Sequence, residues 1–167
     1  MLNHFREMNL TRQNILIFLV GGLLILSSIY VAASNDTKAS VSIDNSTVKL
    51  GGLMFMTNMT DALERSQLEN KMIYIYGRSE FCGWCKKFEA ESLSDERIKR
   101  ILNENFILVR VDTVDQKSLA LSLGIRGTPT SIFTTSEGQE IPGSRLPGYS
   151  DQDSFYQHLN GLIDKEE

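Results

Sequence analysis

The stretch MIYIYGRSEFCGWC occupies residues 72–85 and places two cysteines shortly after an apolar run. Its first five residues are apolar or aromatic, and a run this short is typical of a buried β-strand. Cys82 and Cys85 end the stretch and are the only cysteines in the chain of 167 residues. A helix is expected from residue 83 to about residue 91, so the pair should lie where a strand passes into a helix.

Further strands and helices are expected on both sides of this junction. Thr60 is predicted to cap the first helix, with Asp61 in its first turn, and Ser94 is predicted to cap the helix that follows the cysteine helix. Strands alternate with helices before a final hairpin, which favours an α/β fold with a mixed central sheet flanked by helices. The expected strands are 53–56, 72–76, 106–111, 129–134 and 139–141, and the expected helices are 60–69, 83–91, one after 94, 116–123 and 151–163.

The composition is that of one ordinary folded domain once an apolar N-terminal segment is set aside. Hydrophobic residues make up 41% of the chain and charged residues 23%, near the averages for soluble domains. General disorder and a disulfide-rich scaffold are therefore disfavoured. The formal net charge is -4, which argues against nucleic acid as a partner. Residues 49–167 are assigned to a single domain.

Residues 15–33, ILIFLVGGLLILSSIYVAA, carry no charged side chain, and as a helix they would span about 28 Å, close to the hydrocarbon core of a membrane. This run exceeds the usual signal core of about 7 to 15 residues, which favours a retained transmembrane anchor. Its small-residue end at Ala33 also resembles a signal cleavage site, so a cleaved signal remains the alternative. Arg6 and Arg12 favour a cytoplasmic location for residues 1–14. Either choice exports the remainder.

Residues 34–48, SNDTKASVSIDNSTV, are polar and lack apolar periodicity, which is typical of a flexible tether. Three glycosylation-type triplets begin at Asn35, Asn45 and Asn58, in this tether or just after it. Such triplets matter only on the exported side of a membrane. Chance occurrence is the alternative, because Asn and Thr are abundant here.

The spacing of the two cysteines suits dithiol chemistry. At a helix start, Cys82 would face unpaired backbone N–H groups and the positive end of the helix dipole, which favour its thiolate. Cys85 would follow one turn later, within reach of a disulfide. Cys82 is therefore the predicted nucleophile, and Cys85 is the thiol that resolves the mixed disulfide.

Two other uses of a cysteine pair compete with this one. A structural metal site normally takes four protein ligands, but the chain has no second cysteine pair, and His4 and His158 belong to distant segments. A disulfide between cysteines only three positions apart would constrain the unfolded chain very little. Redox use is the favoured hypothesis, with no metal and no cofactor.

Four further segments accompany the CGWC box: 73–76 (IYIY), 109–112 (VRVD), 124–129 (GIRGTP) and 148–149 (GY). Together they resemble the thioredoxin-like superfamily over about residues 53–163. Within it, CKKFE at 85–89 followed by SDE is most similar to the C-terminal thioredoxin-like domain of the bacterial thiol:disulfide interchange protein and its exported relatives. The resemblance implies a thioredoxin fold and electron transfer through Cys82.

The resemblance also implies roles near the cysteines. Thr128-Pro129 would be a cis peptide beside the pair, and the backbone of Thr128 would pair with substrate as an added strand. Gly83 and Trp84, between the cysteines, would contact substrate or tune the site. The alternative for Pro129 is a proline that merely opens a strand.

One position departs from the family pattern. Thioredoxins and the interchange domain carry a buried acid six residues before the first cysteine, where it handles the proton of the second. Tyr76 stands at that position here. The interchange domain also carries an acid four residues after the second cysteine, which corresponds to Glu89. Glu89 is therefore a candidate proton handler, although a glutamate on a helix surface is usually only solvated.

The sequence as a whole predicts an enzyme, a protein disulfide oxidoreductase on the outer face of the cytoplasmic membrane. It would act on the thiols and disulfides of exported proteins, as a reductant supplied with electrons by an integral membrane thiol carrier. The alternatives are a thioredoxin-like binding module without turnover, and a dithiol oxidase or isomerase.

Overall fold

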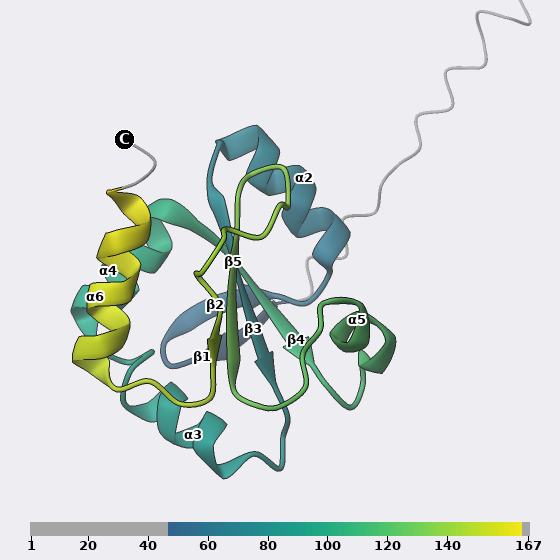
Figure 1. Cartoon of the computed structure of the whole chain (residues 1–167), viewed down its shortest axis with the longest axis vertical. Coiled ribbons are helices and arrows are strands. Elements are labelled where there is room, and N and C mark those ends of the chain that lie inside the picture. Colours follow the sequence, from purple (N-terminus) through teal and green to yellow (C-terminus); the bar gives the residue numbers. More distant parts are fainter. Residues whose placement is uncertain (1–46, 165–167) are drawn as a thin grey trace, which may run out of the picture. The chain divides into compact units, whose positions relative to one another are not determined.

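The computed structural model describes residues 47–164, which form a sheet covered by helices on both faces (Figure 1). The predicted α/β fold with a mixed sheet is confirmed. The strands are β1 (Thr47–Leu50), β2 (Leu53–Met56), β3 (Met72–Arg78), β4 (Phe106–Asp112), β5 (Thr130–Thr134) and β6 (Leu146–Pro147). The helices are α2 (Met59–Glu69), α3 (Gly83–Ala90), α4 (Glu96–Asn105), α5 (Lys117–Ser122) and α6 (Gln152–Ile163).

The strands are ordered β1-β2-β4-β3-β5-β6 across the sheet. Strands β2, β4 and β3 run parallel, whereas β1, β5 and β6 each pair antiparallel with a neighbour. β3 is central and pairs with β4 from Met72 opposite Phe106 to Arg78 opposite Asp112. Because its two neighbours fix it along its length, β3 holds the start of α3 in a defined place.

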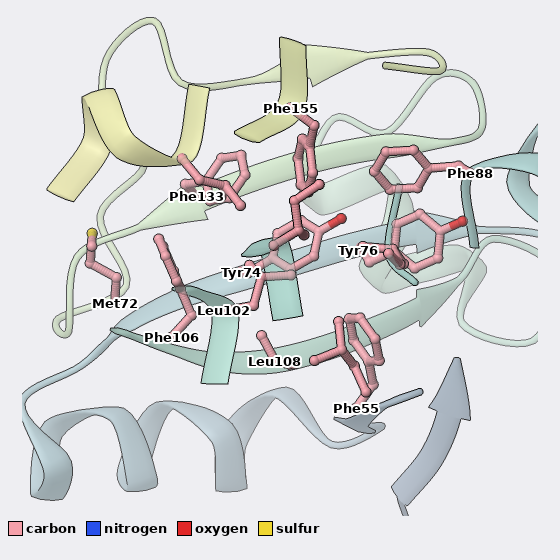
Figure 2. Close-up of a cluster of buried hydrophobic side chains, with 14 of the residues drawn as sticks. Phe55, Met72, Tyr74, Tyr76, Phe88, Leu102, Phe106, Leu108, Phe133 and Phe155 are labelled. Carbon is pink, nitrogen blue, oxygen red and sulfur yellow. The ribbon is translucent and has the colours of Figure 1, made fainter. Parts of the chain in front are cut away.

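Alternation along β3 divides the core into two layers. Tyr74 and Tyr76 point to the face covered by α3, α4 and α6, and both are fully buried in an aromatic cluster (Figure 2). Ile73 and Ile75 point to the other face, where α2 and α5 pack. Every side chain of a strand buried on both faces is removed from water, which explains why the first five residues of β3, 72–76, are all apolar or aromatic. The aromatic layer also contains Phe55, Phe88, Phe106, Phe133 and Phe155.

Two predicted helix caps are wrong by one or two residues. Asn58, rather than Thr60, caps α2, and its Oδ1 accepts hydrogen bonds from the backbone N–H groups of Thr60 and Asp61. Asp95, rather than Ser94, caps α4. The Ser94 hydroxyl instead donates to the Glu89 carbonyl, at 2.8 Å. All these residue types can cap a helix, so composition alone does not choose between neighbours.

The sheet edges also differ from expectation. β1 begins at Thr47 and pairs with β2, so the folded part takes in two residues of the stretch 34–48. The strand expected at 139–141 is reduced to a single bridge between Thr134 and Glu140. β6 pairs with the other end of β5, at Thr130 and Ser131.

The expected transmembrane segment at 15–33 lies outside the described residues, as do most of the tether, Asn35 and Asn45. Within residues 47–164, no helix is long and apolar enough to cross a membrane.

Candidate redox site

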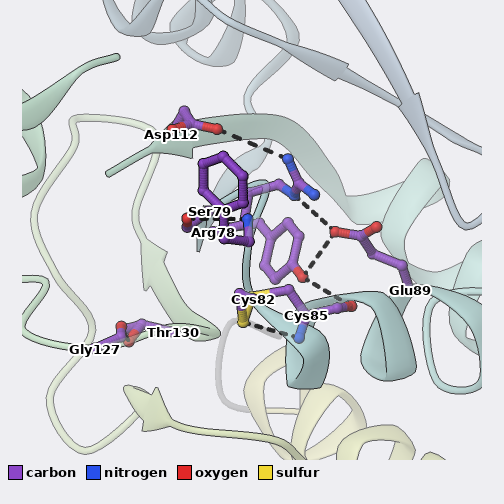
Figure 3. Close-up of a disulfide and its surroundings, with 10 residues drawn as sticks. Arg78, Ser79, Cys82, Cys85, Glu89, Asp112, Gly127 and Thr130 are labelled. Atoms are coloured by element: carbon purple, nitrogen blue, oxygen red, sulfur yellow. Dashed lines mark hydrogen bonds and ion pairs between the residues drawn. A yellow bond between two sulfur atoms is a disulfide. The ribbon is translucent and has the colours of Figure 1, made fainter. Parts of the chain in front are cut away.

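Cys82 and Cys85 lie at the start of α3, directly after the loop that leaves β3. They form a disulfide with a Cα–Cα separation of 5.2 Å (Figure 3). Cys82 is the N-cap residue, and its Sγ accepts a hydrogen bond from the Cys85 backbone N–H at 3.0 Å. The predicted junction of strand, cysteines and helix is confirmed.

The two sulfur-bearing residues differ in exposure. Cys82 is partly exposed at the helix start, whereas Cys85 is fully buried in the aromatic core layer. A thiolate at position 82 would lie at the helix N-terminus, where backbone N–H groups and the helix dipole stabilise negative charge. The geometry therefore separates an accessible sulfur from a shielded one.

Trp84 forms one wall beside the cysteines. Its side chain is 59% exposed, and its ring packs against Tyr149 with centroids 5.6 Å apart. The Lys87 ammonium lies 4.9 Å from the Tyr149 ring centroid and 5.3 Å from that of Trp84. The Tyr149 hydroxyl donates to Glu91 at 2.6 Å, and this hydrogen bond raises the pKa of Tyr149. The aromatic pair of Trp84 and Tyr149 is thus held by the Lys87 ammonium and the Glu91 carboxylate.

The Thr128–Pro129 peptide bond is cis, as the resemblance implied. The Gly148 N–H donates to the Pro129 carbonyl at 2.8 Å, which joins the loop before β5 to the loop before α6. A hollow of about 370 Å³ is lined by Trp84, Thr128, Pro129, Gly148 and Tyr149. It brings together the predicted residues of two distant segments. A larger cavity, of about 560 Å³, lies at the opposite end of β3 and includes none of the predicted site residues.

Tyr76 lies beneath α3, where the family pattern would place an acid. Its hydroxyl is 3.1 Å from Glu89 Oε1 and 3.4 Å from the Cys85 carbonyl oxygen. Burial is the main cause that raises the pKa of Tyr76 far above its usual value, and the neighbouring Glu89 adds to it. The hydroxyl therefore stays protonated and acts as a hydrogen-bond donor. It offers the cysteines no carboxylate.

Glu89 is not the solvated surface residue that a helix position usually implies. Its side chain is 15% exposed, and Oε1 forms an ion pair with Arg78 Nε at 2.8 Å. Arg78 extends on to Asp112, with Nη1 3.7 Å from Oδ2 (Figure 3).

The sequence patterns do not single out Arg78. The signal that could have found it is the alternation of β3, which puts residues 74, 76 and 78 on one face.

Gly83 is open rather than crowded, because a Cβ built there meets no atom within 4 Å. His158 lies in α6, where Nε2 is 2.8 Å from the Ser144 carbonyl oxygen. Across residues 47–164, no three His, Cys, Asp or Glu side chains are grouped as metal ligands would be.

Curated relatives and solved structures agree with this geometry. Residues 59–163 match the family described as thioredoxin-like domain. The chain is 34% identical over 100 residues to the thiol:disulfide interchange protein DsbD of Photorhabdus laumondii, which covers 58% of this chain and 17% of that protein. The DsbD of Yersinia enterocolitica is 31% identical over 100 residues, with the same coverage. The chain thus spans about a sixth of the length of these relatives.

Solved structures share the fold. A thioredoxin from Thermus thermophilus has a TM-score of 0.58 at 26% identity, covering 64% of this chain and 85% of that one. The oxidised C-terminal domain of Neisseria meningitidis DsbD has a TM-score of 0.53 at 18% identity, covering 64% of this chain and 97% of that domain. At that identity the second likeness concerns the fold alone.

The family match covers well over half of the chain and includes both cysteines, the cis proline and the helices around them. It agrees with the separate likeness to DsbD in sequence. The protein therefore belongs to the thioredoxin-like family, as a domain of the thiol:disulfide oxidoreductase type with a Cys-Gly-Trp-Cys pair.

Proposed function

We propose that this protein is a membrane-tethered, extracytoplasmic oxidoreductase that reduces disulfides in exported proteins through Cys82 and Cys85. The observation that carries the proposal is the unequal exposure of the two sulfur-bearing residues at the start of α3. Stability alone is a poor reason for this disulfide, because a bridge between cysteines three positions apart constrains the unfolded chain very little.

The reaction follows from that inequality. The Cys82 thiolate attacks one sulfur of a substrate disulfide, forms a mixed disulfide and expels the first substrate thiolate. Cys85 then loses its proton and attacks the Cys82 sulfur, which expels the second substrate thiolate. Two electrons pass from the dithiol to the substrate, the expelled thiolates take up two protons, and the 82–85 disulfide remains.

The substrate chain is proposed to lie across the hollow beside the cysteines. The Thr128 backbone precedes the cis proline and would pair with an extended substrate segment. Trp84, Pro129 and Tyr149 line the same hollow and offer apolar surface to the side chains that flank the substrate cysteine. Gly83 leaves the approach to Cys82 open.

Glu89 is proposed to act on the proton of Cys85 only indirectly. Its Oε1 already accepts from the Tyr76 hydroxyl and from Arg78 Nε, so these two residues fix the position of the carboxylate. The proton of Cys85 would then pass to the first expelled substrate thiolate, which has to take up a proton in the reaction.

The direction of electron flow is proposed to be reductive, on the resemblance of residues 85–96 to an interchange domain that acts as a reductant; the name of the similar DsbD proteins states interchange without a direction. Potentials in this fold range from about -270 mV for reductases to about -120 mV for strong oxidants. A measured potential near about -270 mV would support the proposed reductive direction. A value near about -120 mV would favour the oxidase or isomerase.

Turnover is the experiment that tests the proposal. The full-length protein, supplied with a dithiol reductant, should reduce a test protein disulfide steadily, and Cys82→Ser should abolish this reduction. A folded wild-type protein that binds such substrates without reducing them would be the thioredoxin-like binding module instead.

The membrane tether rests on residues 15–33, followed by the polar stretch 34–48. The protein should stay with membranes after high-salt and carbonate washes, and protease added to intact spheroplasts should remove the domain. Release with Ser34 as the new N-terminus would identify a cleaved signal. An integral membrane thiol carrier is the proposed electron donor, and the pair should become oxidised in cells that lack every such carrier.

A further inference from the structure

A chain of buried charges lies behind the cysteine helix and joins β3, β4 and α3. Arg78 stands at its centre, with Nε 2.8 Å from Glu89 Oε1 and Nη1 3.7 Å from Asp112 Oδ2. Asp112 also pairs with Arg110, whose Nη1 is 3.3 Å from the same Oδ2. Two guanidinium groups and two carboxylates thus balance in charge. Figure 3 shows Arg78 between Asp112 and Glu89.

Because these charged side chains are buried, each charge depends on its partner for compensation. The side chains of Arg78 and Glu89 are only 12% and 15% exposed, so water screens their charges poorly. Removing one partner of a buried pair leaves the other charge without compensation. Within the described part of the chain, Arg78 is the one cation at ion-pair distance from Glu89.

Glu89 connects the pair to the cysteines. The Oε1 atom that accepts from Arg78 also accepts from the Tyr76 hydroxyl, at 3.1 Å. That hydroxyl lies 3.4 Å from the carbonyl oxygen of Cys85. Arg78 and Tyr76 therefore hold one carboxylate oxygen between them, one helical turn beyond the second cysteine.

We propose that Arg78 is a positioning residue of the redox site, which holds the Glu89 carboxylate against Tyr76 and offsets its negative charge at the cysteine pair. The proposal rests on the proposed redox function of that pair. Tyr76 and Arg78 of β3 contact Glu89 directly, and Tyr74 of β3 senses its charge. Asp112 and Arg110 of β4 extend the chain of charges beyond Arg78.

A purely structural role for Arg78 would make a different prediction. An ion pair that only pinned α3 to the sheet would affect stability, and the acidity of the Cys82 thiol in the folded protein would not change. If Arg78 offsets the charge of Glu89, its loss leaves a net negative charge near the cysteines, and a nearby negative charge opposes formation of a thiolate.

The test measures the rate of iodoacetamide alkylation of Cys82 against pH in the reduced full-length protein, with the modified cysteine identified by mass spectrometry. In Arg78→Gln the midpoint of this profile should move up by about half a pH unit or more, equivalent to roughly threefold slower alkylation below the midpoint. Arg78→Lys keeps the positive charge, so its midpoint should lie close to that of the wild type. Arg65→Gln is the matched control, because it removes the same charge from the ion pair with Glu69 in α2.

A double-variant cycle shows whether Arg78 acts through Glu89. Glu89→Gln leaves the Arg78 charge uncompensated and should lower the midpoint, whereas Arg78→Gln/Glu89→Gln removes both charges and should return the midpoint close to the wild-type value. This comparison also serves if Arg78→Gln alone does not fold. An unchanged midpoint in folded Arg78→Gln, an equal shift in Arg65→Gln, no recovery in Arg78→Lys, or a double variant whose midpoint equals that of either single variant would each overturn the proposal. The alkylation profile tests the role of Arg78 and does not require turnover. The turnover assay on the wild-type protein tests the proposed function separately.

Discussion

The sulfur of Cys82 accepts a hydrogen bond from the backbone N–H of Cys85 at 3.0 Å. Cys82 is partly exposed, whereas Cys85 is buried. In the reduced protein the same hydrogen bond would stabilise negative charge on the accessible sulfur, while the Cys85 side chain lies inside the core. Such a hydrogen bond from a helix N-terminus favours a thiolate over a thiol.

This asymmetry predicts different behaviour for two serine variants. Cys85→Ser keeps the attacking thiolate but cannot resolve, so it should accumulate mixed disulfides with natural partners on non-reducing gels. Cys82→Ser should trap almost none, because Cys85 is fully buried. Both variants should remain folded by circular dichroism. Equal trapping, or more by Cys82→Ser, would reverse the two roles.

Trp84 should report the redox state. It is the only tryptophan in the chain, and it adjoins both cysteines in sequence. Reduction of the 82–85 disulfide should change its emission, because the quenching disulfide is replaced by two thiols. The change should follow thiol counts during titration and disappear in Trp84→Phe. Identical emission from the oxidised and reduced wild-type protein would show that the indole does not sense the sulfurs.

The junction around the cysteines could be predicted because its signals are local. A short apolar run followed within a few residues by a cysteine pair and a helix needs no knowledge of the rest of the chain. The cis bond at Thr128–Pro129 is different, since the residues alone favour a trans bond and only the family resemblance pointed to it.

The charge chain at Arg78 could not be predicted in the same way. Its ion pair with Asp112 depends on the register of two parallel strands that a helical connection separates in sequence. The hydrogen bond from Tyr149 to Glu91 joins residues 58 positions apart. The alternation of β3 indicates which face Arg78 shares, but no sequence pattern specifies its partner Asp112 or the contact between Tyr149 and Glu91.

Asn58 offers a test of the observed cap of α2. Asn58→Ala removes the acceptor for two backbone N–H groups and should lower the free energy of unfolding by about 1 kcal/mol. Asn58→Asp keeps an acceptor of equal quality and should cost much less, although it also destroys the glycosylation triplet. Urea unfolding of both variants makes the comparison. Similar losses in the two variants would mean that the cap is not the cause.

Phe155 should be among the most costly core residues to truncate. It is fully buried, and its ring centroid lies 5.1 Å from that of Phe88 and 5.9 Å from that of Tyr74 (Figure 2). Phe155→Ala should lower the free energy of unfolding by about 3 to 5 kcal/mol. Leu121→Ala is the control, since that side chain is 67% exposed and its loss should change stability by less than about 0.5 kcal/mol. Comparable losses in the two variants would contradict the assigned core.

Asp95 should make stability depend on pH in the acid range. Hydrogen bonds from the Arg97 side chain are the main cause that lowers the pKa of Asp95 from 3.8 to about 2, and backbone N–H groups of α4 add to it. A carboxyl group with a depressed pKa in the folded state stabilises the protein above its unfolded pKa, and this contribution is lost as the pH falls through the folded value.

Asp95→Asn isolates the charge, because asparagine caps a helix as well as aspartate does. At pH 7 the variant should be less stable than the wild type by no more than about 1 kcal/mol, since Arg97 is well exposed to solvent. The difference should hold down to about pH 5 and shrink between about pH 4 and pH 2, as the wild-type carboxylate becomes protonated. Urea unfolding at several pH values measures this. A difference that persists unchanged at the acid end would place the effect in the cap rather than in the charge.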